Sequence, residues 1–249
     1  MCIRDSVYGT LSGSAKHFVN RTFAGVTSDK TTRSLVLGLS VDGRDDRGGG
    51  GLNGYSLSLT SGKLDLSAAV SDLAIDDITA KADGGYSKLN YALSRLQRLG
   101  AATSLYLSLS GQFASKNLDS SEQFSLGGPT GVRAYPTGEA IGDEGMLATV
   151  EGRWQIAENW QASAFLDRGQ IRLHKSPWLG WEGLNTTITN TYSLAGAGLG
   201  LTYSTVGNFT VRIFSAMKIG TNPGRNVSGN DADNRDSSSR VWIQAIKFF

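Results

Sequence analysis

The chain has 249 residues, a formal net charge of +2 and a mean hydropathy of -0.19. No stretch approaches the roughly 18 consecutive apolar residues that a membrane-spanning helix needs, which excludes a helical membrane bundle. Lysine and arginine are scattered among aspartate and glutamate, so nothing suggests a nucleic acid as partner. The 5 Trp, 8 Tyr and 9 Phe recur inside regular apolar patterns, which argues against disorder.

The N-terminal residues do not form a secretory leader. Residues 1–6 lack a charged segment followed by an apolar core. They resemble the translated adaptor remnant at the start of some assembled environmental sequences. We therefore interpret residues 1–12 as a non-native or irregular N-terminus and expect the true N-terminus to be missing. Cys2, His17 and His174 are too few and too scattered for a structural zinc site, and neither a metal nor a cofactor is expected.

Alternation of apolar and polar residues with a period of two then repeats along the chain. Residues 34–41, for example, place leucines and a valine at every second position, between serine and glycine. Such alternation predicts strands with one apolar and one polar face. Ten strands are predicted, near 15–26, 33–42, 53–64, 85–97, 102–115, 144–156, 160–173, 192–204, 208–219 and 239–249. A weak helical period covers 67–80.

The lengths of the strands and of their connections predict the fold class. Many predicted strands exceed ten residues, as a tilted strand that crosses the hydrocarbon must. Short connections (98–103, 156–160 and 203–209) alternate with long polar ones (65–84, 116–143, 174–191 and 220–238), which is typical of outer-membrane barrels. Residues 42–53 are predicted to be a flexible insertion. The sequence predicts an all-β, transmembrane antiparallel barrel over 13–249. A soluble barrel or sandwich, which also alternates, is the alternative.

Two motifs lie in and after the long connection at 116–143. The first has a glycine pair, a tip and an entry into the next strand: Gly127-Gly128, Val132-Arg133-Ala134-Tyr135-Pro136, and Gly142-Asp143-Glu144-Gly145. The second lies on a predicted strand and reads Phe165-Leu166-Asp167-Arg168-Gly169. In this order and spacing the motifs resemble the sixth external loop, and a strand shortly after it, of two-partner secretion transporters. These form the haemolysin secretion and activation family of outer membranes.

The resemblance implies a barrel of sixteen strands, preceded by two periplasmic polypeptide-binding domains and a plug helix. Counting back from Phe249 makes 160–173 the thirteenth strand and 116–143 the loop between the eleventh and twelfth, where the family carries these motifs. The chain is thus expected to be a C-terminal fragment of about ten strands. Phe249 resembles the terminal aromatic signal that the barrel-assembly machinery reads. Lys247, on the predicted lipid face, departs from that pattern, and snorkelling would accommodate it.

The resemblance also implies that the loop at 116–143 folds into the barrel lumen, where Arg133 meets Asp167. A charged residue on a barrel wall needs a partner or water. Guanidinium and carboxylate match in a bidentate pair that lysine cannot form. Other residues are expected to leave room for the loop, to pack it against the wall or to act as secondary ion partners: Gly128 and Gly169, Tyr135, and Glu151 with Arg153. The alternative places Arg133 on a solvated surface loop.

Three other patterns predict no site. The acidic residues within 231–236 lack the glycine of a calcium loop, so a disordered external loop is preferred there. The alternating glycines of 196–200 are not a dinucleotide fingerprint, since no helix follows. His17 and His174 lie in or beside loops without a nucleophile elbow, so the chain is not expected to be an enzyme.

The function implied by the resemblance is export of a large exoprotein, such as a haemolysin or adhesin, with or without its activation. The location implied is the outer membrane of a Gram-negative bacterium. With no nucleotide or proton gradient available, direction must come from folding of the exoprotein outside. The expected partners are the exoprotein, outer-membrane lipid and the barrel-assembly machinery. The alternatives are a related barrel-assembly protein, a passive porin, and an enzyme on a soluble barrel.

Overall fold

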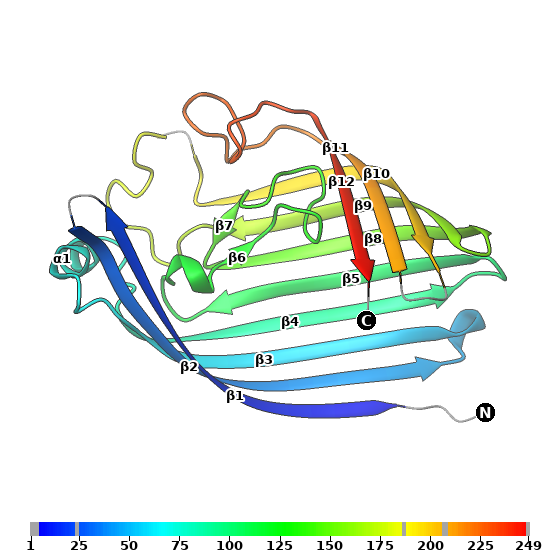
Figure 1. Cartoon of the computed structure of the whole chain (residues 1–249), viewed down its shortest axis with the longest axis horizontal. Helices are drawn as coiled ribbons and strands as arrows, with labels where there is room; N and C mark the ends of the chain where they lie inside the picture. The colour runs from blue at the N-terminus through cyan, green and yellow to red at the C-terminus, as the bar shows by residue number, and fades with distance from the viewer. Residues whose placement is uncertain (1–4, 23–24, 186–187, 206–208, 248–249) are drawn as a thin grey trace.

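The computed structural model describes residues 5–22, 25–185, 188–205 and 209–247, which form one antiparallel sheet of ten strands (Figure 1). Each strand pairs with the next one along the chain. The strands of the sheet are β1 (Ser6–Thr22), β2 (Gly25–Asp45), β3 (Gly51–Asp65), β4 (Gly84–Arg98), β5 (Thr103–Ala114), β8 (Glu144–Ala157), β9 (Trp160–Arg172), β10 (Thr191–Ser204), β11 (Phe209–Lys218) and β12 (Ser239–Lys247). The predicted number and order of strands are confirmed.

The first two strands are longer than the sequence predicts. β1 begins at Ser6, because Ser6–Ser12 pair with Val36–Asp42 of β2. The expectation that residues up to 12 are irregular is therefore wrong from Ser6 onwards. Residues 1–4 and the proposed terminal signal at Phe249 lie outside the described residues.

The connections alternate between the two ends of the sheet. Short turns lie at the right of Figure 1, and the long connections lie at the other end, together with helix α1 (Val70–Ile78), which forms within the weak helical period.

The prediction that residues 42–53 form a flexible insertion is wrong. β2 and β3 continue to pair up to Asp45 and Gly51, leaving a tight turn with the short helix η1 (Arg47–Gly49). The Gln97 side-chain amide fills this turn, since it donates to backbone carbonyls there at 2.9–3.1 Å. None of the described helices is long and apolar enough to cross a membrane.

One face of the sheet is a continuous band of exposed apolar side chains. Cross-strand pairs carry the band from strand to strand, with Leu37 opposite Leu59 and Leu201 opposite Ile213. Its exposed members include Leu35, Leu37, Leu39, Leu57, Leu59, Leu93, Leu109, Met146, Val150, Leu166, Leu199, Ile213, Met217, Val241 and Ile243. Trp160 and Tyr203, with ring centroids 4.8 Å apart, lie at its turn end, where membrane barrels carry aromatic residues. A band of this extent fits lipid hydrocarbon and argues against the soluble alternative.

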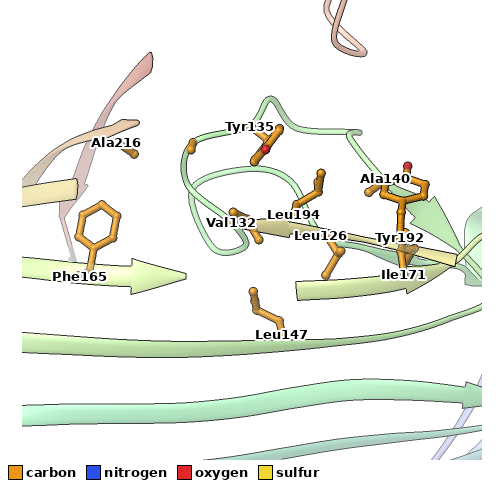
Figure 2. Close-up of a cluster of buried hydrophobic side chains, with 11 residues drawn as sticks. Leu126, Val132, Tyr135, Ala140, Leu147, Phe165, Ile171, Tyr192, Leu194 and Ala216 are labelled. Atoms are coloured by element: carbon orange, nitrogen blue, oxygen red, sulfur yellow. The ribbon is translucent and has the colours of Figure 1, made fainter. Parts of the chain in front are cut away.

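The opposite face curls around the segment 116–143, which we call the lumenal loop (Figure 1). This loop contains the short helix η2 (Ser120–Glu122) and a two-stranded ribbon of β6 (Phe124–Ser125) and β7 (Ile141–Gly142). The largest buried apolar cluster joins the loop to the wall (Figure 2): Leu126, Val132, Ala134, Tyr135, Ala140, Leu147, Phe165, Ile171, Tyr192, Leu194 and Ala216. Within the described residues β1 and β12 each pair with one neighbour, so the sheet does not close on itself.

The apolar band predicts a face-specific response to added charge. Leu57→Arg should destabilise the protein folded in phospholipid vesicles by about 2–4 kcal/mol, because the new charge faces hydrocarbon near the middle of a strand. Ser56→Arg, its neighbour on the lumenal face, is the matched control and should cost much less. Urea titration of refolding into vesicles measures both. Equal losses in the two variants would contradict the assignment of the faces.

Candidate functional site

The tip of the lumenal loop is a compact hairpin that only small residues permit. Val132 N–H donates to the Leu126 carbonyl at 2.6 Å, and Gly127 and Val132 form a parallel bridge. A Cβ atom on Gly131 would overlap the Leu126 carbonyl, and one on Gly127 would overlap the Pro136 carbonyl. Gly128 has φ +113°, a conformation that residues with a Cβ rarely adopt. The glycines therefore let the chain reverse tightly enough for Arg133 to reach the wall.

Arg133 lies against Asp167 of β9 in a bidentate arrangement. Its Nε and Nη2 donate to the two carboxylate oxygens at 2.9 Å each, and its backbone N–H donates to Oδ2 at 3.1 Å. Arg133 is 6% exposed and Asp167 0%. The alternative of a solvated Arg133 is therefore wrong.

A second carboxylate completes the neutralisation. Nη1 of Arg133 donates to Glu151 of β8 at 2.6 Å, and Arg153 Nε donates to the other Glu151 oxygen at 2.8 Å. Thr149 Oγ1 donates to Asp167 at 2.9 Å. We call Arg133, Thr149, Glu151, Arg153 and Asp167 the tip network. It holds two cations and two anions, so the formal charges balance inside the lumen.

Aromatic side chains cover the guanidinium. Its Cζ lies 3.3 Å from the centroid of the Phe165 ring and 5.1 Å from that of Phe214 on β11. Trp242 of β12 donates its indole N–H to the Arg133 carbonyl at 2.7 Å. Sequence reasoning did not single out Phe214 or Trp242. Their inward position in the alternation was the available signal, but nothing in the sequence places them beside the loop tip.

Glycines of the wall leave the space that the tip occupies. A Cβ atom on Gly169 would lie 2.5 Å from Leu126, and one on Gly196 of β10 would lie 2.5 Å from Ala134. A Cβ atom on Gly198 would overlap β11 and lie 2.5 Å from the Phe165 ring. Gly196 thus leaves space for the loop and Gly198 leaves space for Phe165, roles that the sequence did not reveal.

The base of the loop is fixed through Asp143, which is fully buried. Its carboxylate accepts hydrogen bonds from Leu118 N–H at 3.0 Å, Gln123 Nε2 at 2.9 Å and Lys175 N–H at 2.7 Å. These bonds join the loop to the connection between β9 and β10. The flanking glycines lie where side chains do not fit, since a Cβ atom would overlap the Arg172 carbonyl at Gly142 and lie 2.6 Å from Phe124 at Gly145.

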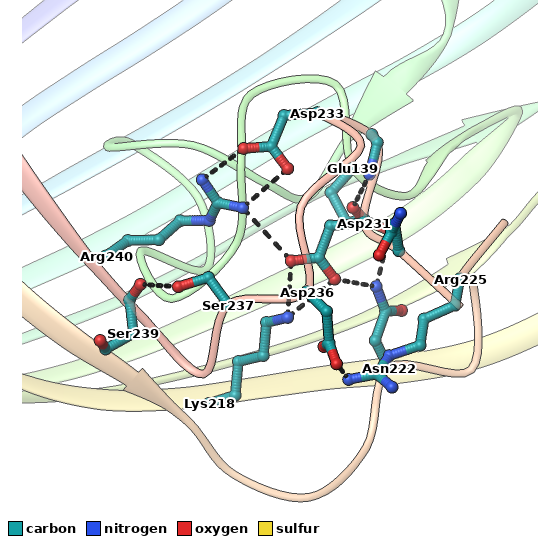
Figure 3. Close-up of polar contacts among 12 residues, drawn as sticks. Glu139, Lys218, Asn222, Arg225, Asp231, Asp233, Asp236, Ser237, Ser239 and Arg240 are labelled. Carbon is teal, nitrogen blue, oxygen red and sulfur yellow. Dashed lines mark hydrogen bonds and ion pairs between the residues drawn. The ribbon is translucent and has the colours of Figure 1, made fainter. Parts of the chain in front are cut away.

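The connection 219–238 between β11 and β12 is folded, so the expectation of a disordered external loop is wrong. Asp231 is fully buried and accepts hydrogen bonds from Lys218 at 2.6 and 2.7 Å and from Asn222 at 2.9 Å (Figure 3). Burial raises the pKa of Asp231, but these hydrogen bonds outweigh it and leave the pKa below its ordinary value. Asp233 pairs with Arg240 and Asp236 with Arg225. Within the described residues no group of His, Cys, Asp or Glu side chains is placed to hold a metal ion.

The two histidines lie apart from the tip network. His17 contacts Asp29 at 2.6 Å. The His174 ring lies 4.5 Å from Trp178 and 5.4 Å from Trp181, centroid to centroid, and burial lowers the pKa of His174.

The loop tip is held against the wall by contacts that can be undone without covalent chemistry. Beside the tip, a cavity of about 320 Å³ is lined by side chains that include Arg153, Gln161, Arg212 and Gln244. Displacing the loop breaks the four hydrogen bonds that Arg133 donates and the one that its carbonyl accepts from Trp242. It leaves charged and polar groups on the wall.

Comparison with known proteins gives matches over 66% to 90% of the chain at 28–30% identity. Heme/hemopexin transporter protein HuxB of Haemophilus influenzae is 28% identical over 229 residues, which are 90% of this chain and 37% of the relative. HuxB of H. influenzae strain 86-028NP is 30% identical over 168 residues, which are 66% of this chain and 27% of the relative. The chain therefore spans about a third of the length of these relatives.

Solved structures and a family model agree with these matches. CdiB from Escherichia coli superposes with a TM-score of 0.69 at 18% identity, over 96% of this chain and 41% of that one. CdiB from Acinetobacter baumannii gives 0.50 at 15% identity, over 97% and 48%. The sequence model described as haemolysin secretion/activation protein ShlB/FhaC/HecB matches residues 19–203. The expected family is confirmed, and the chain belongs to the haemolysin secretion/activation protein ShlB/FhaC/HecB family.

Proposed function

We propose that this chain is the C-terminal barrel part of a two-partner secretion transporter, which exports a partner exoprotein through a lumen that the lumenal loop plugs. The observation that carries the proposal is the bidentate contact of Arg133 with Asp167, buried between the loop and the wall. A passive porin needs no such contact. The members of the family are transporters rather than enzymes, and no step of the proposed export needs a catalytic residue.

The sheet formed by residues 6–247 supports a larger barrel. Unpaired strand edges are not tolerated in lipid, because no water is present to satisfy their N–H and C=O groups. β1 and β12 each lack a second neighbour in the described residues, which supports further strands at both edges. We propose that these strands complete the sixteen-stranded barrel. Phe249 is proposed as the signal to the assembly machinery.

The two faces of the sheet support a membrane environment and a polypeptide partner for the protein. The apolar band fits the lipid of a Gram-negative outer membrane, where barrels of this family reside. The polar lumen fits an extended polypeptide, whose backbone groups need hydrogen-bonding partners during passage. The family supports a secreted exoprotein, such as a haemolysin or adhesin, as the partner. Folding of that partner outside removes the extended chain from the equilibrium and gives export its direction.

The tip network predicts coupled effects on export. Arg133→Ala and Asp167→Ala in the full-length transporter should each lower secretion of the partner while the barrel still inserts. Removing one member of a buried pair costs about 3–5 kcal/mol, and water in the lumen reduces this figure. The double variant should lose less than the sum, because the two residues act in one ionic network. Quantitative secretion assays and conductance in planar bilayers measure the effects.

Arg168→Ala, which removes an exposed arginine from the opposite face of β9, is the matched control and should leave secretion and conductance near those of the unmodified protein. Strictly additive losses in the double variant would show that Arg133 and Asp167 act independently, and the plug mechanism would then be abandoned.

The proposed environment predicts the behaviour of the full-length protein during purification. It should fractionate with outer membranes, require detergent for extraction and migrate faster in electrophoresis when unheated than when boiled. The reason is that a closed barrel with an apolar exterior stays folded in detergent until it is heated. Recovery of a soluble monomer without detergent would defeat the membrane assignment.

A further inference from the structure

The lumenal loop makes a second contact six residues after Arg133, with the connection between β11 and β12. Glu139 is 2% exposed and points away from the tip, toward the connection 219–238 (Figure 3). Its Oε1 accepts a hydrogen bond from Asn222 Nδ2 at 2.8 Å, and its Oε2 accepts one from Ala232 N–H at 2.7 Å. We call Glu139, Asn222 and Ala232 the outer anchor.

We propose that Glu139 is a positioning residue that anchors the lumenal loop to the connection 219–238, so that the loop leaves the lumen only after this connection releases it. The inference rests on the proposed function, because it concerns how the plug is held. It assigns a role in gating to a connection outside the two sequence motifs.

The backbone on either side of Glu139 supports a positioning role. Gly138 has φ +87° and Ala140 has φ +53°, so two left-handed residues flank the carboxylate. For glycine this conformation carries little strain, but an alanine there is strained. Strained backbone persists where the surrounding structure determines it, and it concentrates at functional positions. Here the two turns direct the Glu139 side chain out of the hairpin and toward Asn222.

The buried Glu139 carboxylate adds little to the stability of the fold, but it fixes the orientation of the lumenal loop relative to the connection 219–238. Burial raises the pKa of the Glu139 carboxyl, and the hydrogen bonds from Ala232 and Asn222 only partly offset it. A buried carboxylate gives less net stability than a well-packed apolar side chain of similar size. It does require its donors in one geometry, so the contact forms only when the loop and the connection are both in place.

The connection 219–238 is itself attached to the wall. Asn222, which donates to Glu139, also donates to Asp231. Asp231 accepts hydrogen bonds from Lys218, the last residue of β11, and from Arg240 of β12 at 3.2 Å. Lys218 lies 5.0 Å from the Tyr135 ring centroid of the loop. The outer anchor thus leads from the loop through Asn222 and Asp231 to the last two strands.

The two attachments have different charged partners. Those of Arg133 in the tip network belong to β8 and β9, whereas those of the outer anchor belong to β11 and β12. The tip also touches β11 and β12, but through the rings of Phe214 and Trp242. The tip network and the outer anchor share no residue. Because the free energies of independent contacts add, the factors by which two single variants raise the opening frequency should multiply in the double variant.

The test measures opening of the full-length transporter in planar lipid bilayers. Glu139→Ala and Asn222→Ala should each raise the frequency of full channel openings about tenfold, which corresponds to about 1.4 kcal/mol. Glu139→Gln keeps an acceptor for Ala232 N–H and should fall between Glu139→Ala and the unmodified protein. Asp236→Asn, which removes an ion pair with Arg225 inside the connection, is the matched control and should leave the frequency unchanged.

A second measurement follows the loop itself. A cysteine introduced by Thr130→Cys at the loop tip should react faster with an external maleimide in the Glu139→Ala background, with heat-modifiable migration unchanged.

Combining Glu139→Ala with Asp167→Ala should multiply the two increases in opening frequency. If Asp167→Ala opens the channel but Glu139→Ala and Asn222→Ala do not, the outer anchor is wrong and the proposed plug stands. If none of the three changes opening, both are wrong. A double variant no more open than Asp167→Ala overturns the independence of the anchors.

Discussion

A guanidinium buried inside a barrel must be neutralised on every side, and the structure around Arg133 is organised by that requirement. Asp167 takes two of its donors, Glu151 takes a third, and Phe165 covers its face. To bring Arg133 to this place, the loop must reverse tightly, which the glycines at 127, 128 and 131 allow. The wall must also lack side chains opposite the tip, which the glycines of β9 and β10 provide. One buried charge thus explains a large share of the glycine along 116–200.

Much of the fold could be predicted, because a sheet with lipid on one side and polar groups on the other has apolar and polar residues in alternation. The strand limits were predicted wrongly where the two faces do not differ in polarity. In β1 the lipid-facing positions include Gly9 and Gly13, which interrupt the apolar series, yet both pair with leucines of β2. At the rim, Asp42–Asp45 is polar on both faces, so the extension of β2 gave no signal, although its pairing with β3 continues.

Some contacts of the candidate site could be predicted from the sequence and others could not. Arg133 and Asp167 were expected to meet because both motifs resemble those of a known family, and no periodicity implies that contact. Trp242 lies 109 residues from Arg133 in sequence, and no pattern in the sequence near either residue indicates a contact at such separation. The fold of the connection 219–238 was missed for a further reason. Its aspartates resemble a solvated acidic loop until the cations that neutralise them, Lys218 and Arg240, are placed beside them by β11 and β12.

The hydrogen bond from Trp242 to the Arg133 carbonyl gives the protein an intrinsic optical reporter. With the loop in place, the indole has a fixed backbone acceptor, is half-buried and lies opposite Phe214 of β11. When the tip departs, the ring faces a wet lumen, and its fluorescence should shift to longer wavelength. The tryptophans at 154 and 160 lie at the turn end of the outer face, and those at 178 and 181 lie in the connection after β9. Replacing these four by phenylalanine would leave Trp242 as the single tryptophan of these 249 residues, and its emission would follow the loop.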